Sequence, residues 1–138
     1  MTASDSAIEL VSIASSAAAE KLADAIIAYD VSDQLVITDA FLLCSASNDR
    51  QVRSIVEEIE DRMRDAGHKP VRREGEREGR WVLLDYLEVI VHVQLDEERT
   101  FYALERLWKD CPELPLPADV VEHNRRREEL RAAAGEQR

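Results

Sequence analysis

The first hydrophobic pattern along the chain has the period of a helix. Apolar and small side chains recur at three- and four-residue steps, which places them on one face of an α-helix. Ser6 and Glu9 form a capping-box pair in front of this stripe. The pattern runs on until the polar segment 30–33, so it predicts a single helix that ends there. The predicted stripe consists of Ile8, Val11, Ser15, Ala18, Leu22, Ile26 and Tyr29.

Two short apolar runs and a second amphipathic pattern follow. The runs at 35–37 and 41–45 are short and bounded by polar residues, so they predict strands. Ser47 and Asn48 then suit the N-terminus of a helix, and Gly67 suits its end. The buried stripe of this second helix is predicted to be Val52, Ile55, Val56, Ile59 and Met63.

The middle of the chain has the pattern of a β-hairpin. Residues 70–73 are interpreted as a short edge strand, and the glycine-containing charged segment 74–80 as a loop. The runs WVLLD (81–85) and VIVHV (89–93) are separated by only three residues, a spacing that favours antiparallel pairing. Both faces of the second run are mostly apolar, which is typical of a central strand.

The last helical pattern starts at Asp96, interpreted as an N-cap, and carries Phe101, Leu104 and Trp108 on one stripe up to Pro112. Residues 1–116 are predicted to form one domain. Residues 117–138 are predicted to be a charged tail, partly helical or disordered, with too few apolar anchors to dock firmly. The order α-β-β-α-β-β-β-α predicts an α/β (α+β) fold, a mixed sheet with helices packed on it.

Charge narrows the classes of partner. The 138-residue chain has a formal net charge of −11, which disfavours direct contact with nucleic acid because phosphate binding depends on Lys and Arg. Such a surface suits a basic protein partner. The alternative is that the acidity only keeps the protein soluble.

Targeting and metal signals are not found in the sequence. No apolar run has the length of a membrane span and the N-terminus lacks the basic start of a signal peptide, so we expect a cytoplasmic protein. Cys44 and Cys111 lack a CxxC context and are interpreted as reduced thiols. The three histidines fall in different predicted elements, so no metal site is expected. His92, flanked by valines, is interpreted as a buried structural histidine rather than a catalytic one.

Aromatic residues make up 5% of the chain and concentrate between Trp81 and Trp108. Because Trp and Tyr are the side chains most used as binding anchors, this block is the predicted centre of function. The alternative is that Trp81, Phe101 and Trp108 belong to the core. An enzyme is the less favoured hypothesis, since the sequence has no GxSxG motif, no Gly-rich phosphate loop and no pair of carboxylates one residue apart at a strand end.

Five segments in order resemble the ribosomal silencing factor family, also called Iojap-like. They are ITD before FLLCS, SNDRQVRSI, WVLLDY, VIVHV and DEERTFYALERLWKDCPEL, spread from about residue 6 to residue 116. The resemblance implies a nucleotidyltransferase-like fold without its catalytic centre, and no cofactor. It also implies a translational repressor that binds the large ribosomal subunit through a basic ribosomal protein at the intersubunit face, the fourteenth in the large-subunit naming. The docked protein would sterically block joining of the small subunit.

The resemblance also implies a set of partner-binding residues. Asp85, Tyr86 and Arg99 are expected to be exposed contacts, whereas Trp81 and Trp108 have the core alternative. Leu87 departs from the family, which commonly has glycine there. The partner-binding residues are Asp39, Trp81, Asp85, Tyr86, His92, Arg99, Tyr102, Glu105 and Trp108; the family pattern also falls on Ser47, Arg50 and Leu107.

Two alternatives stay open beside the repressor hypothesis. One is a nucleotide-binding or nucleotidyltransferase-related enzyme that uses an unpaired carboxylate such as Asp39, Asp85 or Glu88. The other is self-association, with a homodimer in the free state formed through an uncovered strand or the Ala-rich first helix. A minor contact with rRNA accompanies the repressor hypothesis.

Overall fold

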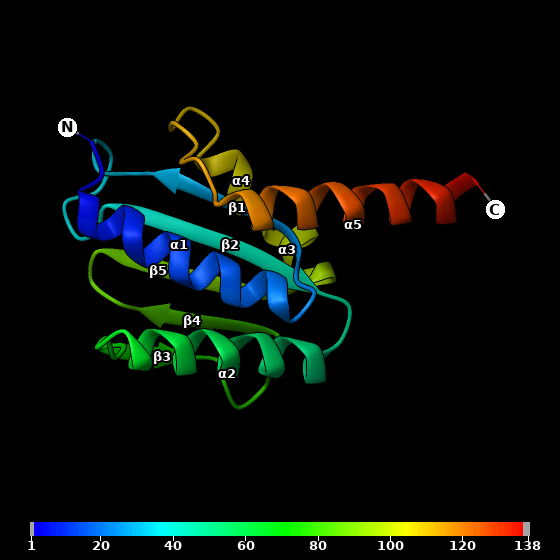
Figure 1. Cartoon of the computed structure of the whole chain (residues 1–138), viewed down its shortest axis with the longest axis horizontal. Helices are drawn as coiled ribbons and strands as arrows, with labels where there is room; N and C mark the ends of the chain where they lie inside the picture. Colours follow the sequence, from blue (N-terminus) through cyan, green and yellow to red (C-terminus); the bar gives the residue numbers. More distant parts are fainter. Residues whose placement is uncertain (1, 137–138) are drawn as a thin grey trace.

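A computed structural model describes residues 2–136 of the chain (Figure 1). A five-stranded sheet carries helices on both faces, so the predicted mixed α/β fold class is confirmed. The elements are α1 (Asp5–Glu20), β1 (Asp24–Asp30), β2 (Ala40–Ala46), α2 (Asp49–Asp65), β3 (Arg72–Glu74), β4 (Trp81–Asp85), β5 (Val89–Leu95), α3 (Asp96–Tyr102), α4 (Leu104–Leu107) and α5 (Ala118–Glu136).

The strands are ordered β1-β2-β5-β4-β3. β2 and β5 are parallel, with Ala40 opposite Val89, and the other neighbouring pairs are antiparallel. β5 therefore lies in the centre, and the hairpin of β4 and β5 is formed, both as predicted. The turn that joins β1 to β2 and the turn that joins β4 to β5 lie at the same end of the sheet, at the left of Figure 1.

The main core lies between one face of the sheet and helices α1 and α2, which run side by side across it (Figure 1). The predicted stripe of α2 is confirmed, because all five of its apolar residues are buried. Asn48 caps this helix, as predicted, by accepting a hydrogen bond from the Gln51 amide at 2.8 Å. Gly67 has a φ of 91°, a conformation that glycine adopts without strain, and it follows the end of the helix.

The predicted length of the first helix is wrong. α1 begins after Ser4, whose hydroxyl accepts the Ala7 amide, and it ends at Glu20. Leu22 takes a φ of 62°, which turns the chain out of the helix. The following residues pair with β2 as strand β1 instead. Ile26 and Tyr29 are thereby buried on opposite faces of the sheet, whereas a helix would have buried one face only.

The strand predicted at 35–37 is also wrong. This segment belongs to the turn between β1 and β2, where the amides of Gln34 and Leu35 bond to the Val31 carbonyl. The side chains of Val36 and Ile37 point into solvent, with exposed fractions of 104% and 73%. The short apolar run lacks a neighbouring strand to pair with, so its β propensity has no effect on the backbone.

The single helix predicted from Asp96 is divided. Ala103 takes a φ of 48°, which ends α3 and starts α4, so Phe101 and Trp108 do not share one stripe. Asp96 is the first residue of α3 rather than its N-cap, a position that Leu95 occupies. The carboxylates of this first turn still complement the positive end of the helix dipole.

Candidate docking face

The second face of the sheet lies on the side away from α1 and α2. Alternate residues of each strand point there, because side chains alternate between faces in a β-strand. Tyr29, Phe41 and Ile90 form a smaller apolar cluster on this face, against which Trp108 packs. Helices α3 and α4 lie behind the sheet in Figure 1 and cover part of this face.

A continuous series of ring contacts crosses this face, and we call its members the aromatic row. Trp108 meets Phe41 at a centroid distance of 4.9 Å, and Phe41 meets His92 at 5.1 Å. His92 lies 6.0 Å from Trp81, which lies 4.8 Å from Tyr102. Phe101 ends the row, 5.0 Å from Tyr102. The aromatic row consists of Phe41, Trp81, His92, Phe101, Tyr102 and Trp108.

Exposure differs between the middle of the aromatic row and the end formed by Tyr102 and Phe101. Phe41 and His92 are buried, while Trp81 and Trp108 are half-buried. Phe101 and Tyr102 are 80% and 48% exposed. The inner residues therefore stabilise the fold, and the outer two are accessible to a partner. The alternative interpretation, that Trp81, Phe101 and Trp108 are core residues, is therefore confirmed in part for the half-buried tryptophans and is wrong for the exposed Phe101.

His92 is held in its neutral form. Trp81 Nε1 donates a hydrogen bond to His92 Nδ1 at 3.1 Å, so the ring proton lies on Nε2. Burial lowers the pKa of His92 from 6.5 to about 4. A histidine that is uncharged at neutral pH and enclosed between rings is structural, as its valine neighbours indicated. Its exposed fraction is 7%, so the interpretation of His92 as a partner-binding residue is not supported by its position.

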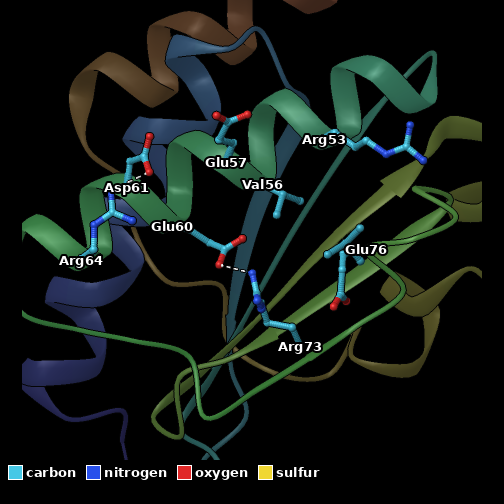
Figure 2. A pocket seen from close by; sticks show the side chains of 9 residues that line it. Arg53, Val56, Glu57, Glu60, Asp61, Arg64, Arg73 and Glu76 are labelled. Atoms are coloured by element: carbon cyan, nitrogen blue, oxygen red, sulfur yellow. Dashed lines mark hydrogen bonds and ion pairs between the residues drawn. The ribbon is translucent and has the colours of Figure 1, made fainter.

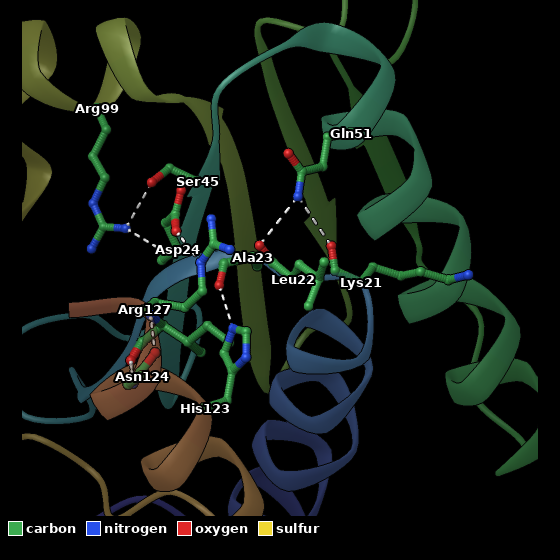
Figure 3. A network of polar contacts seen from close by, with 11 residues as sticks. Lys21, Leu22, Ala23, Asp24, Ser45, Gln51, Arg99, His123, Asn124 and Arg127 are labelled. Carbon is green, nitrogen blue, oxygen red and sulfur yellow. Dashed lines mark hydrogen bonds and ion pairs between the residues drawn. The ribbon is translucent and has the colours of Figure 1, made fainter. Parts of the chain in front are cut away.

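A polar junction joins the sheet to α3, the helix that also carries Phe101 and Tyr102 (Figure 3). The Arg99 guanidinium donates to Glu105 at 2.9 Å and to the Asp24 carbonyl and Ser45 Oγ at 3.1 Å each. Its side chain is only 10% exposed. Arg99 therefore fastens α3 to the sheet at the ends of β1 and β2.

The first half of α5 docks on the same junction. Asn124 accepts the Ile26 amide at 3.1 Å and donates to the Ile26 carbonyl at 2.9 Å, so its carboxamide occupies the outer edge of β1. Arg127 donates to Asp24 Oδ1 at 2.8 Å, and His123 Nε2 lies 2.6 Å from the Ala23 carbonyl oxygen. The expectation that this segment lacks the anchors to dock firmly is wrong, because these polar groups and the fully buried Val120 supply them. The rest of α5 projects away from the body in Figure 1.

Two further predicted partner-binding residues, Tyr86 and Arg99, are not on the surface as expected. Tyr86 is 6% exposed, and its ring belongs to the core that faces α1 and α2. Burial raises the pKa of Tyr86 to about 12. Arg99 is turned inward by its three partners. The interpretation of both as exposed contacts is therefore wrong.

The predicted acidic residues are engaged within the fold. Asp39 accepts the Ser4 amide at 3.0 Å and Asp85 accepts the Leu87 amide at 2.8 Å. Glu105 pairs with Arg99. Each of these three carboxylates therefore has a different partner within the fold. Among the described residues, no group of three or more His, Cys, Asp or Glu side chains is placed to hold a metal ion.

The other residues of the family pattern lie in two places. Ser47 and Arg50 are exposed at the start of α2, whereas Leu107 is 69% exposed on α4, next in sequence to Trp108. Sequence reasoning missed Phe41, Ser45, Asp24, Asn124 and Arg127. Their contacts join segments far apart in the chain, so no local pattern indicates them.

A pocket of about 340 Å³ lies between α2 and the β3–β4 region (Figure 2). Charges of both signs surround it, and four of them form two ion pairs: Glu60 with Arg73, and Asp61 with Arg64, each at 2.9 Å. Val56 and Val82 add apolar surface to its lining. The pocket therefore offers no concentrated field for an ion. Separately, none of the described helices is long and apolar enough to cross a membrane.

The family model for "Ribosomal silencing factor during starvation" matches residues 4–138. The ribosomal silencing factor RsfS of Bacillus subtilis is 40% identical over 103 residues, which cover 75% of this chain and 87% of that protein. The factor of the same name from Halalkalibacterium halodurans is 36% identical over 78% of this chain and 92% of its own. The chloroplastic protein Iojap of Zea mays is 30% identical over 60% of this chain and 36% of its own.

Solved structures agree with the fold. A crystal structure from Bacillus halodurans superposes with a TM-score of 0.70 at 34% identity, covering 78% of this chain and 98% of that one. A crystal structure from Chromobacterium violaceum gives 0.71 at 30% identity, covering 73% and 84%. Because the family model matches residues 4–138 of this 138-residue chain, the chain belongs to the ribosomal silencing factor family.

Proposed function

We propose that this protein lowers translation by docking on the large ribosomal subunit and blocking the small subunit sterically. Membership of the silencing factor family is consistent with translation regulation. The partner we propose is a basic ribosomal protein at the intersubunit face, the fourteenth in the large-subunit naming. The action needs no catalysis and takes place in the cytoplasm.

The observation that carries the proposal is the exposed end of the aromatic row. Phe101 and Tyr102 present two accessible rings on α3. The first turn of the same helix carries Asp96, Glu97 and Glu98. Aromatic anchors inside a charged rim are the usual make-up of a binding hot spot, and negative rim charges favour a basic partner.

Alanine substitution of the two outer rings tests this role. Tyr102→Ala and Phe101→Ala should each weaken co-sedimentation with purified large subunits, since an interface anchor contributes on the order of 2 kcal/mol. Trp81→Ala should also weaken it, partly because Tyr102 then loses the ring beside it. Leu130→Ala is the matched control, because Leu130 is similarly exposed at 62% but lies on the projecting half of α5.

The readout separates binding from folding. Circular dichroism should show that the variants at 101 and 102 keep their helical content, since neither side chain is buried. In mixtures of both subunits, the wild type should reduce the joined particle and the Tyr102→Ala variant should not. Unchanged co-sedimentation of both ring variants would contradict the proposed docking face.

The free protein gives a second measurement. We propose that it forms a homodimer that competes with docking. Sizing the protein with and without large subunits reports whether the dimer and the docked form exclude each other. A minor contact with rRNA would appear as residual binding that high salt removes.

A further inference from the structure

The turn between β4 and β5 contains a strained leucine. The Tyr86 amide bonds to the Val89 carbonyl at 2.9 Å, so Leu87 and Glu88 form a two-residue hairpin loop. Leu87 has a φ of 69°, while Glu88 is not among the positive-φ residues. The Glu88 amide also bonds to the Tyr86 carbonyl at 2.9 Å, so Leu87 is the central residue of a γ-turn, and the positive φ marks the rare, strained form of that turn. A leucine there strains the backbone.

The side chain of Leu87 gives the fold little in return. It is 59% exposed and belongs to neither buried cluster. A strained residue persists where something else requires it, and such residues gather at functional sites. We therefore ask whether the Leu87 side chain itself has a function that accounts for the strain.

Two further apolar side chains lie on the neighbouring turn. The amides of Asp39 and Ala40 both bond to the Glu88 carbonyl, which joins the β1–β2 turn to the β4–β5 turn. Val36 and Ile37 on that turn are the most and third most exposed of the large apolar residues that the structure describes. We call Val36, Ile37 and Leu87 the turn patch. It lies at the left of Figure 1, at the opposite end of the sheet from α3.

The charged residues that flank the turn patch along the chain are all acidic, and Arg72 lies opposite Asp85 on β3. Asp33 and Asp39 flank Val36 and Ile37, and Asp85 and Glu88 flank Leu87. The sequence contains no Lys or Arg from 22 to 49 or from 81 to 98. Two copies of this surface placed together would repel each other, whereas a positively charged protein surface would be attracted.

We propose that the turn patch is a second docking surface, which inserts into an apolar depression with a basic rim on the ribosomal protein partner. The inference rests on the proposed function and extends it, since it adds a contact at the far end of the sheet from Phe101 and Tyr102. The strain at Leu87 is then the consequence of presenting an apolar side chain at the tip of a tight turn.

Substitution by glycine separates stability from binding. Leu87→Gly removes the strain together with the side chain, so the thermal midpoint should not fall. The dissociation constant for purified large subunits should nevertheless rise about tenfold, as for loss of an interface anchor. The double variant Val36→Ser with Ile37→Ser should weaken binding similarly, because neither side chain is buried.

Leu22→Gly is the matched control. Leu22 is also a left-handed leucine, with a φ of 62° and an exposed fraction of 53%, but it lies at the other end of the sheet. Its substitution should leave the dissociation constant within about twofold of the wild type.

The outcomes distinguish the two proposals. If the wild type binds and both turn-patch variants bind equally well, the turn patch is not a docking surface and the proposed function stands. An equal loss in Leu22→Gly would attribute the effect to glycine itself and overturn the inference. If Leu87→Gly abolishes only a homodimer seen by sedimentation velocity, the occupant is a second copy and the inference is wrong. A wild type that does not bind large subunits overturns both.

Discussion

Replacing Arg99 by methionine should destabilise the protein more than any loss of a surface ion pair. Methionine keeps most of the apolar stem and removes the guanidinium. The three partners of that group are Glu105, the Asp24 carbonyl and the Ser45 hydroxyl. Ser45 is 2% exposed and Asp24 is 7% exposed, so water reaches them poorly.

The expected loss is about 3 kcal/mol. Leaving a buried acceptor without its donor costs roughly 1–3 kcal/mol, and the Asp24 carbonyl loses a charged donor in this way. The Ser45 hydroxyl adds a smaller amount because it can rotate toward another acceptor. The ion pair with Glu105 adds little, since the Glu105 side chain is 43% exposed and solvent screens it.

Equilibrium denaturation in urea measures this loss. The unfolding free energy of Arg99→Met is compared with that of Arg80→Met, a control whose guanidinium bonds to Glu98 on the exposed surface. The control should lose far less stability. A loss in Arg99→Met below about 1 kcal/mol, equal to an ordinary surface hydrogen bond, would refute the role assigned to the polar junction.

Three further predictions concern His92, Asn124 and Gly75. The pKa of His92 is lowered from 6.5 to about 4, so only the unfolded chain binds a proton between these values. Unfolding free energy should therefore fall by up to about 3 kcal/mol from pH 6.5 to pH 4, and His92→Gln should show a shallower fall in urea titrations. Asn124→Ala should remove about 1–3 kcal/mol and speed amide exchange at Ile26; unchanged exchange would contradict the edge contact. Gly75→Ala should lower the thermal midpoint clearly, because a Cβ there would lie 1.9 Å from the Trp81 carbonyl oxygen and φ is +80°. A midpoint equal to that of the wild type would show that the turn relaxes freely.

Parts of the fold that depend on neighbouring residues could be predicted from the sequence. The stripe of α2 and the hairpin of β4 and β5 are local patterns, and both are confirmed. The end of α1 could not be read in the same way. Apolar residues up to Tyr29 continue the helical period, and only pairing with β2 decides that they form a strand. The strand predicted at 35–37 is wrong for the opposite reason. These residues have strand propensity, but no neighbouring strand pairs with them.

The sequence indicated the block that holds most of the aromatic row, but not which of its side chains are exposed. The block from Trp81 to Trp108 does contain most of the aromatic row. The missing information was the direction of the side chains. The sequence does not show whether the Arg99 side chain points toward Asp24 or toward solvent. The helix break at Ala103 likewise decides which rings are exposed, and alanine carries no signal for a left-handed conformation.

The position of β5 has a consequence for how the chain acquires its structure. The central strand is the last of the five in sequence, and its parallel pairing joins Ala40 to Val89. In a growing chain that ends before residue 89, β1 with β2 and β3 with β4 lack the strand that hydrogen-bonds to both β2 and β4. Closing so long a loop makes pairing slow and nearly all-or-none. The protein should therefore gain its sheet late in synthesis, in one step, shortly after the residues of β5 leave the ribosome that made it.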